Sequence, residues 1–438
     1  MARYVVVVVM LSVLLSLVAV PAYAADPEYK FPAKGKPYEG VTLNVSLVAE
    51  SKPDALKKEL PEFEAKTGIK VNLDILPYPT LQEKQFTAVT QQTGAYDIIH
   101  VDCVWMGQYA GQGWLYPVTD FVAQTDPAVL QLDDFHPRIL EEQCMWEGVL
   151  YGLPFINAVH VMYYRTDIFE KHNLKPPDTW EELREIAKKI KDAEGIGGVT
   201  FMGKRGVQLL CNYVGMLGAF GGNFYDENYK ATLDSPEAIA ALEYFVSLVP
   251  LANPGVLAQD WDECAATFAE GKAATNLQWQ NAAPVFADPQ KSKVLGQWAV
   301  YLQPGVKQPD GTIRRSPCFG GWDMGISVDS KNKEAAWEFI VWATTREMEH
   351  KLSYAMPSSR PSVLADPELK AKYIEYDAML KSLDFAMGRP RIPEWPQMAD
   401  LIEAALSEAM TGVKTPEQAL KDVNPLIDEI LMAAGYQK

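Results

Sequence analysis

Aromatic and polar side chains stand together at several points where an apolar segment of this chain ends. The groups are Trp105 close to Asp102, Phe155 and Asn157 directly after Pro154, Trp279 between Gln278 and Gln280, and Trp322-Asp323 after Gly320-Gly321. An aromatic ring covers the apolar C–H face of a sugar ring, while carboxylate and amide groups hydrogen-bond its hydroxyls. Each tryptophan taken alone fits core packing equally well, so the grouping carries the interpretation. These are the residue types of a carbohydrate-binding site.

Carboxylates at the ends of predicted strands favour a second interpretation, which is catalysis. Glu50, Asp102 and Asp323 lie at such ends, and two carboxyl groups are sufficient for a glycoside hydrolase. The patterns H-E-x-x-H, G-x-S-x-G and G-x-x-x-x-G-K-[ST] do not occur. The glycines of 215–221 lack the spacing of a dinucleotide fingerprint and fit a helix end. We therefore expect no enzyme, no cofactor and no metal, with a secreted glycan hydrolase as the alternative.

The start of the chain is typical of an export signal. Arg3 gives a positive start, residues 4–20 are an uncharged Val/Leu-rich run, and residues 21–24 place small side chains where a signal peptidase cuts. The alternative is an uncleaved anchor, because the run approaches the length of a membrane span. We expect cleavage after Ala24. Ala25 then follows the cut, where a lipid-anchored protein would carry Cys, so the mature protein is expected outside the cytoplasm without a lipid anchor.

Length, charge and cysteine content restrict the class of protein. A chain of 438 residues is too long for one hydrophobic core and predicts two or more domains. The net charge of −17 disfavours nucleic acid and anionic lipid as partners. An oxidising compartment allows one or two disulfides, but buried single thiols are the simpler interpretation because no C-x-x-C pair occurs. The cysteines are Cys103, Cys144, Cys211, Cys264 and Cys318.

The hydrophobic pattern predicts strands that alternate with helices near the N-terminus. Strands at 41–48, 69–76 and 96–101 are separated by amphipathic helices at 54–67 and 80–92. This order is typical of a parallel sheet covered on both faces. Later strands are expected at 149–154, 160–164, 297–302 and 324–328. Helices are expected between 180 and 290, at 333–345 and at 397–411 and 415–434. The pattern predicts two lobes that the chain visits more than once, with ligands at the carboxyl ends of the strands.

Short segments spread over nearly the whole chain form an ordered set. They are Gly68–Val71, Tyr96–Ile99, Gly113–Pro117, Gly148–Pro154, Met162–Asp167, Pro177–Leu183, Phe268–Ala274, Gly320–Ile326 and Ala335–Phe339. In order and spacing they resemble the extracellular solute-binding proteins of family 1, the carbohydrate-binding components of bacterial ABC importers. The resemblance runs from about residue 41 to 434. The ending, 416–421 and then Gly435-Tyr436, looks most like the branch that imports polyols and simple sugars.

The resemblance implies an α/β fold of two lobes, each a mostly parallel sheet covered by helices, with a hinge between them. We expect an N-terminal lobe at 25–157 plus 303–350 and a C-terminal lobe at 158–302 plus 351–438. A solute in the cleft bridges the lobes and stabilises the closed form, which permease subunits in the inner membrane recognise. The implied protein is a monomer without a cofactor. The missing lipid-bearing Cys favours a Gram-negative periplasm. A sensory binding module would need a membrane tether.

The resemblance also implies a set of ligand contacts. They are Glu50 and Ser51 after the first strand, Asp102 and Trp105 after the third, Phe155 and Asn157 at the first crossing, Trp279 as the stacking residue, Gly321, Trp322 and Asp323 on a cleft loop, and Arg360 near the last crossing. Arg360 has a second interpretation as a salt bridge within a lobe. As a ligand contact it would suit an acidic or sulfonated sugar. The chain departs from the family at 273–275 and at Arg165-Thr166, which leaves the identity of the ligand open.

Overall fold

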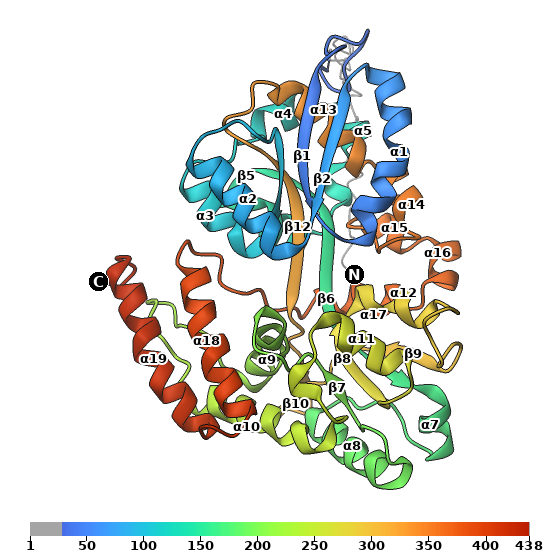
Figure 1. The fold of residues 1–438 in the computed structure, drawn as a ribbon, viewed down its shortest axis with the longest axis vertical. Helices are drawn as coiled ribbons and strands as arrows, with labels where there is room; N and C mark the ends of the chain where they lie inside the picture. The colour runs from blue at the N-terminus through green and yellow to red at the C-terminus, as the bar shows by residue number, and fades with distance from the viewer. Residues whose placement is uncertain (1–28, 438) are drawn as a thin grey trace, which may run out of the picture.

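The computed structural model describes residues 29–437 and arranges them in two lobes, one above the other in Figure 1. The export signal expected at residues 1–24 lies outside the described residues. Within residues 29–437, no helix has the length and apolarity needed to cross a membrane. The expectation of a two-lobed α/β fold is confirmed.

A parallel sheet forms the centre of the upper lobe. β1 (Thr42–Val48) lies between β2 (Lys70–Leu76) and β3 (Ile98–Asp102) and pairs in parallel with both. α1 (Ser51–Thr67) and α2 (Tyr78–Thr90) make the connections. Nearly all side chains of β1 and β3 are buried, as expected for parallel strands with helices on both faces. The carboxyl ends of these strands point down toward the second lobe (Figure 1).

One long strand joins the two lobes. β6 (Gly152–Arg165) pairs first with β12 (Phe319–Ile326) and then with β8 (Thr275–Trp279) and β9 (Trp298–Tyr301). The result is an eight-stranded sheet in the order β2-β1-β3-β12-β6-β8-β7, in which β7 is Thr200–Phe201 and β9 also pairs with β6. β6 changes partners where Val159 faces Phe319 and His160 faces Trp279. The crossing between the lobes therefore lies at these two residues.

Strands β6 and β12 differ in extent from the sequence prediction, and β7 and β8 lie between residues 180 and 290, where the sequence predicts helices. The strands expected at 149–154 and 160–164 are largely one strand, and Pro154 lies inside it. The register of β6 against β12 shifts at Phe155, because Asp323 faces Pro154 while Trp322 faces Ile156. Proline lacks the N–H that a regular ladder needs, and a bulge accommodates it. β12 also begins five residues earlier than expected, so the residues predicted on a cleft loop, 321–323, lie within a strand.

Helices dominate the lower lobe. They are α8 (Trp180–Glu194), α9 (Val207–Phe220), α10 (Pro236–Leu248) and α11 (Trp261–Ala269), beside β8 and the short β7 (Thr200–Phe201). The last two helices, α18 (Trp395–Met410) and α19 (Pro416–Ala433), lie side by side and pack on α9 and α10 (Figure 1). α8 begins with the capping box that its sequence predicts. Glu182 N–H donates to Thr179 Oγ1 at 3.2 Å, and Thr179 N–H donates to the Glu182 carboxylate at 3.1 Å.

The segment after β12 runs beside the crossing. α13 (Lys333–Thr344) and α14 (Arg346–Leu352) pack on the upper lobe, and three shorter helices follow: α15 (Pro361–Leu364), α16 (Pro367–Lys372) and α17 (Tyr376–Leu383). Apolar side chains of these three form one core with Val159 of β6 and Phe319 of β12. The hinge is therefore packed against its own small hydrophobic core.

The other elements are short. They are α3 (Met106–Gly111), α4 (Thr119–Ala123), α5 (Pro127–Leu130), α6 (Pro137–Ile139), α7 (Thr166–Lys171), α12 (Ala283–Ala287), β4 (Met145–Trp146), β5 (Val149–Leu150), β10 (Val306–Lys307) and β11 (Ile313–Arg314). The last two belong with the lower lobe, because Gly305 bridges Thr179 and Arg314 Nε donates to the Ala219 carbonyl at 2.8 Å. The sequence predicts a return to the upper lobe at 303. These contacts place that return at β12.

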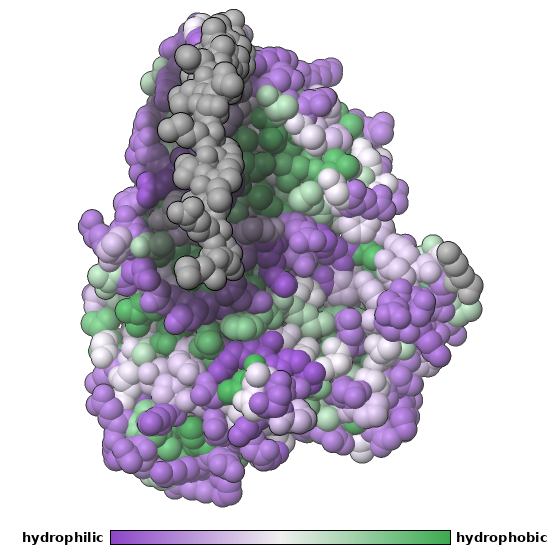
Figure 2. All heavy atoms as spheres, turned by 180° about the vertical axis from the view of Figure 1, so that it is seen from behind, coloured by the Kyte–Doolittle hydropathy of each residue, from purple (hydrophilic) through white to green (hydrophobic). Residues whose placement is uncertain are grey.

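The surface is polar and acidic. The net charge of the sequence is −17, and hydrophilic residues cover much of the face seen in Figure 2. Many charged side chains form exposed pairs, such as Lys351 with Glu62 at 2.8 Å. Such pairs contribute little to stability. The buried charges described below are therefore the informative ones.

Gly198 lies against the backbone of α8 within the lower lobe. A Cβ there would be 2.0 Å from the Ala187 carbonyl oxygen and 2.4 Å from the Ala187 Cα. Gly198→Ala should displace α8 and lower the Tm, because overpacking a core costs about 1–3 kcal/mol. Gly111→Ala is the matched control, since its methyl group would meet nothing closer than 3.8 Å. Equal melting temperatures for the two variants, measured by calorimetry, would contradict this prediction.

Candidate functional site

A cavity of about 90 Å³ lies between the lobes. Its walls are Glu50, Tyr78, Asp102, Ala158, Val207, Gln208, Cys211, Trp261, Trp279, Asn281, Gly320, Gly321, Trp322 and Arg389. Glu50 and Asp102 stand at the carboxyl ends of β1 and β3, and Trp279 ends β8. The site therefore collects the ends of strands from both lobes, as expected for open α/β sheets.

An ion pair and a phenol organise one wall of the cavity. Arg389 Nη2 lies 3.4 Å from Asp102 Oδ1, and the Tyr78 hydroxyl donates to Asp102 Oδ2 at 3.0 Å. Arg389 is only 6% exposed, and its Nε is buried without a hydrogen-bond partner among the described residues. The carboxylate balances the guanidinium charge. Arg389 therefore places a charge-balanced guanidinium group at this wall of the cavity.

Glu50 and Asn281 connect the two lobes across the cavity. Asn281 Nδ2 donates to Glu50 Oε2 at 3.4 Å. Burial raises the pKa of Glu50 to about 7; the hydrogen bond from Asn281 opposes this rise and the charge of Asp102 adds to it. Near neutral pH the carboxyl group can therefore either donate or accept a hydrogen bond.

Two tryptophans supply apolar surface to the cavity, and each is held from behind. Trp279 Nε1 donates to Gln208 Oε1 at 2.7 Å, and the His160 ring lies edge-on at 4.1 Å between centroids. Trp322 lies against the His100 ring, with 4.9 Å between centroids. Each tryptophan is 6% exposed. The rings are therefore fixed before any ligand arrives, which lowers the entropy cost of binding.

Glycine is required where β12 passes the cavity. A Cβ on Gly320 would be 3.0 Å from the Trp279 ring. Gly321 has φ +151°, and a Cβ there would be 1.8 Å from Gln143 Nε2. The absence of side chains lets the Trp279 ring lie close to the backbone of β12.

The structure brings some of the predicted site residues to the cavity and not others. Glu50, Asp102, Trp279, Gly321 and Trp322 line it. Trp105 lines an adjoining cavity of about 260 Å³, which shares Tyr78, Val207 and Arg389 with this one. Its ring is edge-on to Trp322, with 5.3 Å between ring centroids.

Ser51, Phe155 and Asn157 are engaged elsewhere. Ser51 Oγ donates to the Ala355 carbonyl at 2.8 Å. Phe155 is fully buried, and Asn157 Nδ2 donates to the Ser358 carbonyl at 2.8 Å. Their side chains hold the crossing segments together instead of lining the cavity.

Arg360 makes structural contacts, in agreement with the second interpretation of its sequence position. Its guanidinium group donates to the carbonyls of Thr344, Gln131 and Leu130, each at 2.8 Å. It lies 3.6 Å from Asp134 and stacks 3.9 Å from the centre of the Phe135 ring. The positive charge of the cavity comes from Arg389 instead.

Asp323 is buried away from the cavity, because neighbouring residues of a strand point to opposite faces and Trp322 faces the cavity. Both carboxyl oxygens lack a hydrogen-bond partner among the described residues, and burial raises the pKa of the group well above its ordinary value. Burial therefore favours the neutral form of this acid. Of the three carboxylates considered for catalysis, only Glu50 and Asp102 share the cavity.

Several cavity residues were missed from the sequence. Tyr78 follows β2, which the sequence predicts, so the strand-end rule would have found it. Asn281 follows β8, a strand that the sequence analysis does not predict. Gln208 lies in the first turn of α9, and Trp261 begins α11. Arg389 lies in an irregular segment before α18, where no periodic pattern marks it.

The cysteines are buried, and one of them lies at the site. All five cysteines are buried and free, which confirms the simpler interpretation of the sequence. Cys211 lines the cavity. Within residues 29–437, no cluster of three or more His, Cys, Asp or Glu is placed to hold a metal ion.

Comparison with known proteins identifies similar chains. The family model of bacterial extracellular solute-binding proteins matches residues 49–349. A probable amino-acid ABC transporter periplasmic-binding protein of Sinorhizobium fredii is 24% identical, over 95% of this chain and 95% of its own. The mannitol-binding protein of Pseudomonas aeruginosa is 25% identical, over 91% of this chain and 94% of its own. An ABC transporter solute-binding protein from Agrobacterium radiobacter, solved with ribitol, has a TM-score of 0.82 and 31% identity, over 90% of this chain and 100% of that one.

Glu50 provides a pH-dependent test of the site. Its pKa of about 7, against an ordinary value of 4.5, means that the folded state binds this proton more tightly than the unfolded chain. The resulting stability is complete below about pH 4.5 and is lost as the pH rises to about 7. Glu50→Gln cannot lose a proton. The Tm of this variant should therefore rise relative to wild type across that interval and keep a constant offset above it.

The measurement is the Tm of both proteins from acidic to mildly alkaline pH. Glu83→Gln, at an exposed position of α2, is the control against which the offset of Glu50→Gln is compared. A Glu50→Gln offset that does not grow with pH would show that Glu50 is not held in a desolvated site.

Proposed function

The chain belongs to the bacterial extracellular solute-binding protein family, and from that premise we propose that it captures a neutral polyol or simple sugar in the cavity between its lobes and delivers it to an ABC importer. The family model covers most of the chain, and the similar proteins are ABC transporter binding proteins. A permease is therefore the implied partner. We propose that the protein acts as a monomer without nucleic acid, in the periplasm, after cleavage behind Ala24.

The observation that supports a sugar or polyol is the composition of the cavity. Trp279 and Trp322 offer aromatic faces, while Glu50, Asp102 and Arg389 offer hydrogen-bonding groups between them. Such a pairing suits molecules with alternating C–H and O–H groups. Two similar proteins carry ligands of this class in their names, mannitol and ribitol.

Charge favours a neutral ligand over a sugar acid. The guanidinium group of Arg389 is already paired with Asp102, and Glu50 adds a second carboxyl group to the wall. An anionic ligand would face these carboxylates in a buried site, where like charges repel more strongly than in water. The acidic or sulfonated sugar considered above depended on Arg360, and that side chain is bound to backbone carbonyls.

Size favours a single ring or a short chain. The cavity of about 90 Å³ adjoins a second one of about 260 Å³, and together they lie near the lower end of the range of about 300–1,000 Å³ that is common for drug-sized ligands. We therefore propose a monosaccharide or an alditol. We also propose that no reaction follows binding. The glycan hydrolase alternative finds no support among the similar proteins, which are binding proteins.

A thermal-shift panel tests the ligand class. Ribitol, mannitol and a hexose are each compared with the corresponding sugar acid at equal concentration and pH. At about 100 times its Kd, a ligand of the folded state adds about 2.7 kcal/mol of stability, so the neutral solute that fits should raise the Tm clearly while its acid should not. Chromatography of the recovered solute should show it unchanged. A stronger shift with the acid, or any product release, would overturn the proposal.

Trp279→Ala tests the stacking surface. Removing a buried aromatic anchor typically costs about 2 kcal/mol or more, so the affinity for the solute identified above should fall by about thirtyfold or more. Trp114→Ala is the control, because this tryptophan packs on Tyr109 and Phe86 in the upper lobe and lies outside the cavity wall. Titration calorimetry compares the two variants. Unchanged affinity in Trp279→Ala would remove Trp279 from the site.

A further inference from the structure

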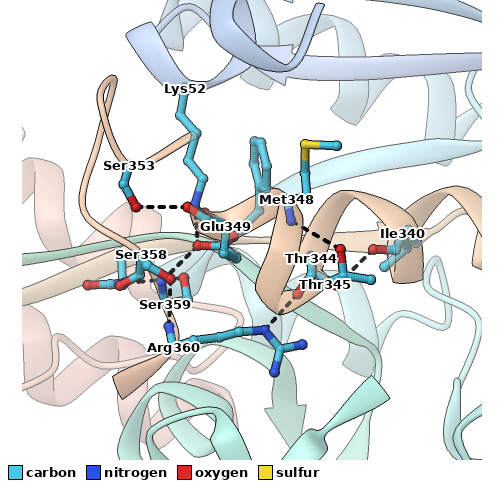
Figure 3. A network of polar contacts seen from close by, with 12 residues as sticks. Lys52, Ile340, Thr344, Thr345, Met348, Glu349, Ser353, Ser358, Ser359 and Arg360 are labelled. Carbon is cyan, nitrogen blue, oxygen red and sulfur yellow. Dashed lines mark hydrogen bonds and ion pairs between the residues drawn. The ribbon is translucent and has the colours of Figure 1, made fainter. Parts of the chain in front are cut away.

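A fully buried ion pair lies behind the cavity, next to the hinge (Figure 3). Lys52 Nζ donates to both carboxylate oxygens of Glu349 at 2.8 Å and to the Phe155 carbonyl at 2.5 Å. Both charged side chains are 0% exposed. The three N–H groups of the ammonium therefore have three acceptors. The position of Lys52 is fully specified by its partners.

These bonds join three distant parts of the chain. Lys52 is in the first turn of α1, two residues after Glu50 of the cavity wall. Phe155 belongs to β6, three residues before Ala158, which also lines the cavity. Glu349 belongs to α14. A displacement of Lys52 would therefore shift two residues of the cavity wall, Glu50 through α1 and Ala158 through β6.

The same carboxylate also anchors the last crossing segment. Glu349 Oε2 accepts the Ser359 N–H at 3.1 Å, and Asn157 of β6 donates to the neighbouring Ser358 carbonyl at 2.8 Å. Arg360 then binds the Leu130 and Gln131 carbonyls of the upper lobe. Figure 3 shows Lys52, Glu349 and the 358–360 segment meeting at one point. Two of the segments that pass the hinge are thus held by one ion pair.

Stability alone gives little reason for this arrangement. Burying two charges costs several kcal/mol per ion, and an apolar pair of similar volume is often equally stable or more so. An apolar pair, however, has no directional bonds and would not fix α1 relative to β6. The ion pair supplies bonds of fixed direction, which a packed apolar core does not.

We propose that Lys52 is a positioning residue for solute binding, which through Glu349 and the Phe155 carbonyl holds Glu50 at the cavity wall and keeps the crossing segments in register for closure. Lys52 does not line the cavity. The proposal rests on the proposed function for its effect on affinity, but its effect on Glu50 is independent of any ligand.

The test separates position from stability with two variants. Lys52→Met leaves Glu349 buried and unpaired, so it should lose both stability and affinity. Lys52→Met combined with Glu349→Leu removes both charges and should recover most of the Tm. Its affinity for mannitol or ribitol should still fall about tenfold, or 1.4 kcal/mol, because Glu50 is no longer held. Recovery of affinity together with stability would overturn the proposal.

A second readout needs no ligand. Glu50→Gln is introduced into the double variant, and the Tm offset caused by this change is followed against pH. Asp102, Tyr78, Cys211 and Arg389, the other titratable cavity groups, are the same in both backgrounds. The offset should grow with pH much less than in the wild-type background, because a displaced Glu50 regains water. An offset of full size would overturn the proposal even if no solute is found to bind.

Two further variants complete the design. Lys351→Met removes an exposed lysine from the same helix as Glu349, and it should leave the affinity and the Glu50 offset unchanged. Glu349→Gln keeps the side-chain shape and one acceptor oxygen, so it serves if the double variant does not fold. It should weaken the affinity and reduce the Tm offset caused by Glu50→Gln, each by less than the double variant does. Wild-type values for both quantities in Glu349→Gln would contradict the proposal.

Discussion

The hydrogen bonds of β6 fix the relation between the two lobes, because this strand belongs to both. Its first half pairs with β12 and its second half with β8 and β9. Backbone ladders run on either side of Val159 and His160, with a bulge at Phe155, and we expect bending where the partners change. The walls of the cavity follow from this point. Ala158 lines the cavity directly, and Trp279 stands opposite His160. The small core around Val159 and Phe319 then supports the crossing from outside.

Buried basic side chains of this protein form ion pairs with buried carboxylates. Arg389 meets Asp102 at the cavity wall, and Lys52 meets Glu349 behind it. Where a carboxyl group lacks a cation, as at Glu50 and Asp323, burial raises its pKa. This pattern favours a neutral ligand, because the cavity has no unbalanced positive charge to offer an anion. It also means that acidity at the surface, with a net charge of −17, says little about the site.

Prediction from the sequence succeeded where a local rule applied and failed where the answer depended on a distant partner. The rule that ligands meet the carboxyl ends of strands pointed to Glu50, Asp102 and Trp279, which line the cavity. The same rule predicted that Asp323 would contact the ligand together with Trp322. In the strand, however, neighbouring side chains point to opposite faces, so only Trp322 reaches the cavity. Arg360 and Arg389 could not be told apart from the sequence. Which guanidinium meets backbone carbonyls and which meets Asp102 is decided by segments that lie far away in the chain.

The sequence by itself determined the two-lobed α/β fold and the family, because hydrophobic periodicity and ordered motifs are local properties of the chain. It also pointed to Glu50, Asp102, Trp279 and Trp322, which line the cavity. Only the tertiary structure decided that β6 is one strand through both lobes, that Arg389 supplies the charge, and that Lys52 meets Glu349. Each of these depends on contacts between residues far apart in the sequence. No local pattern records such contacts, since the bonds form only when the lobes have packed.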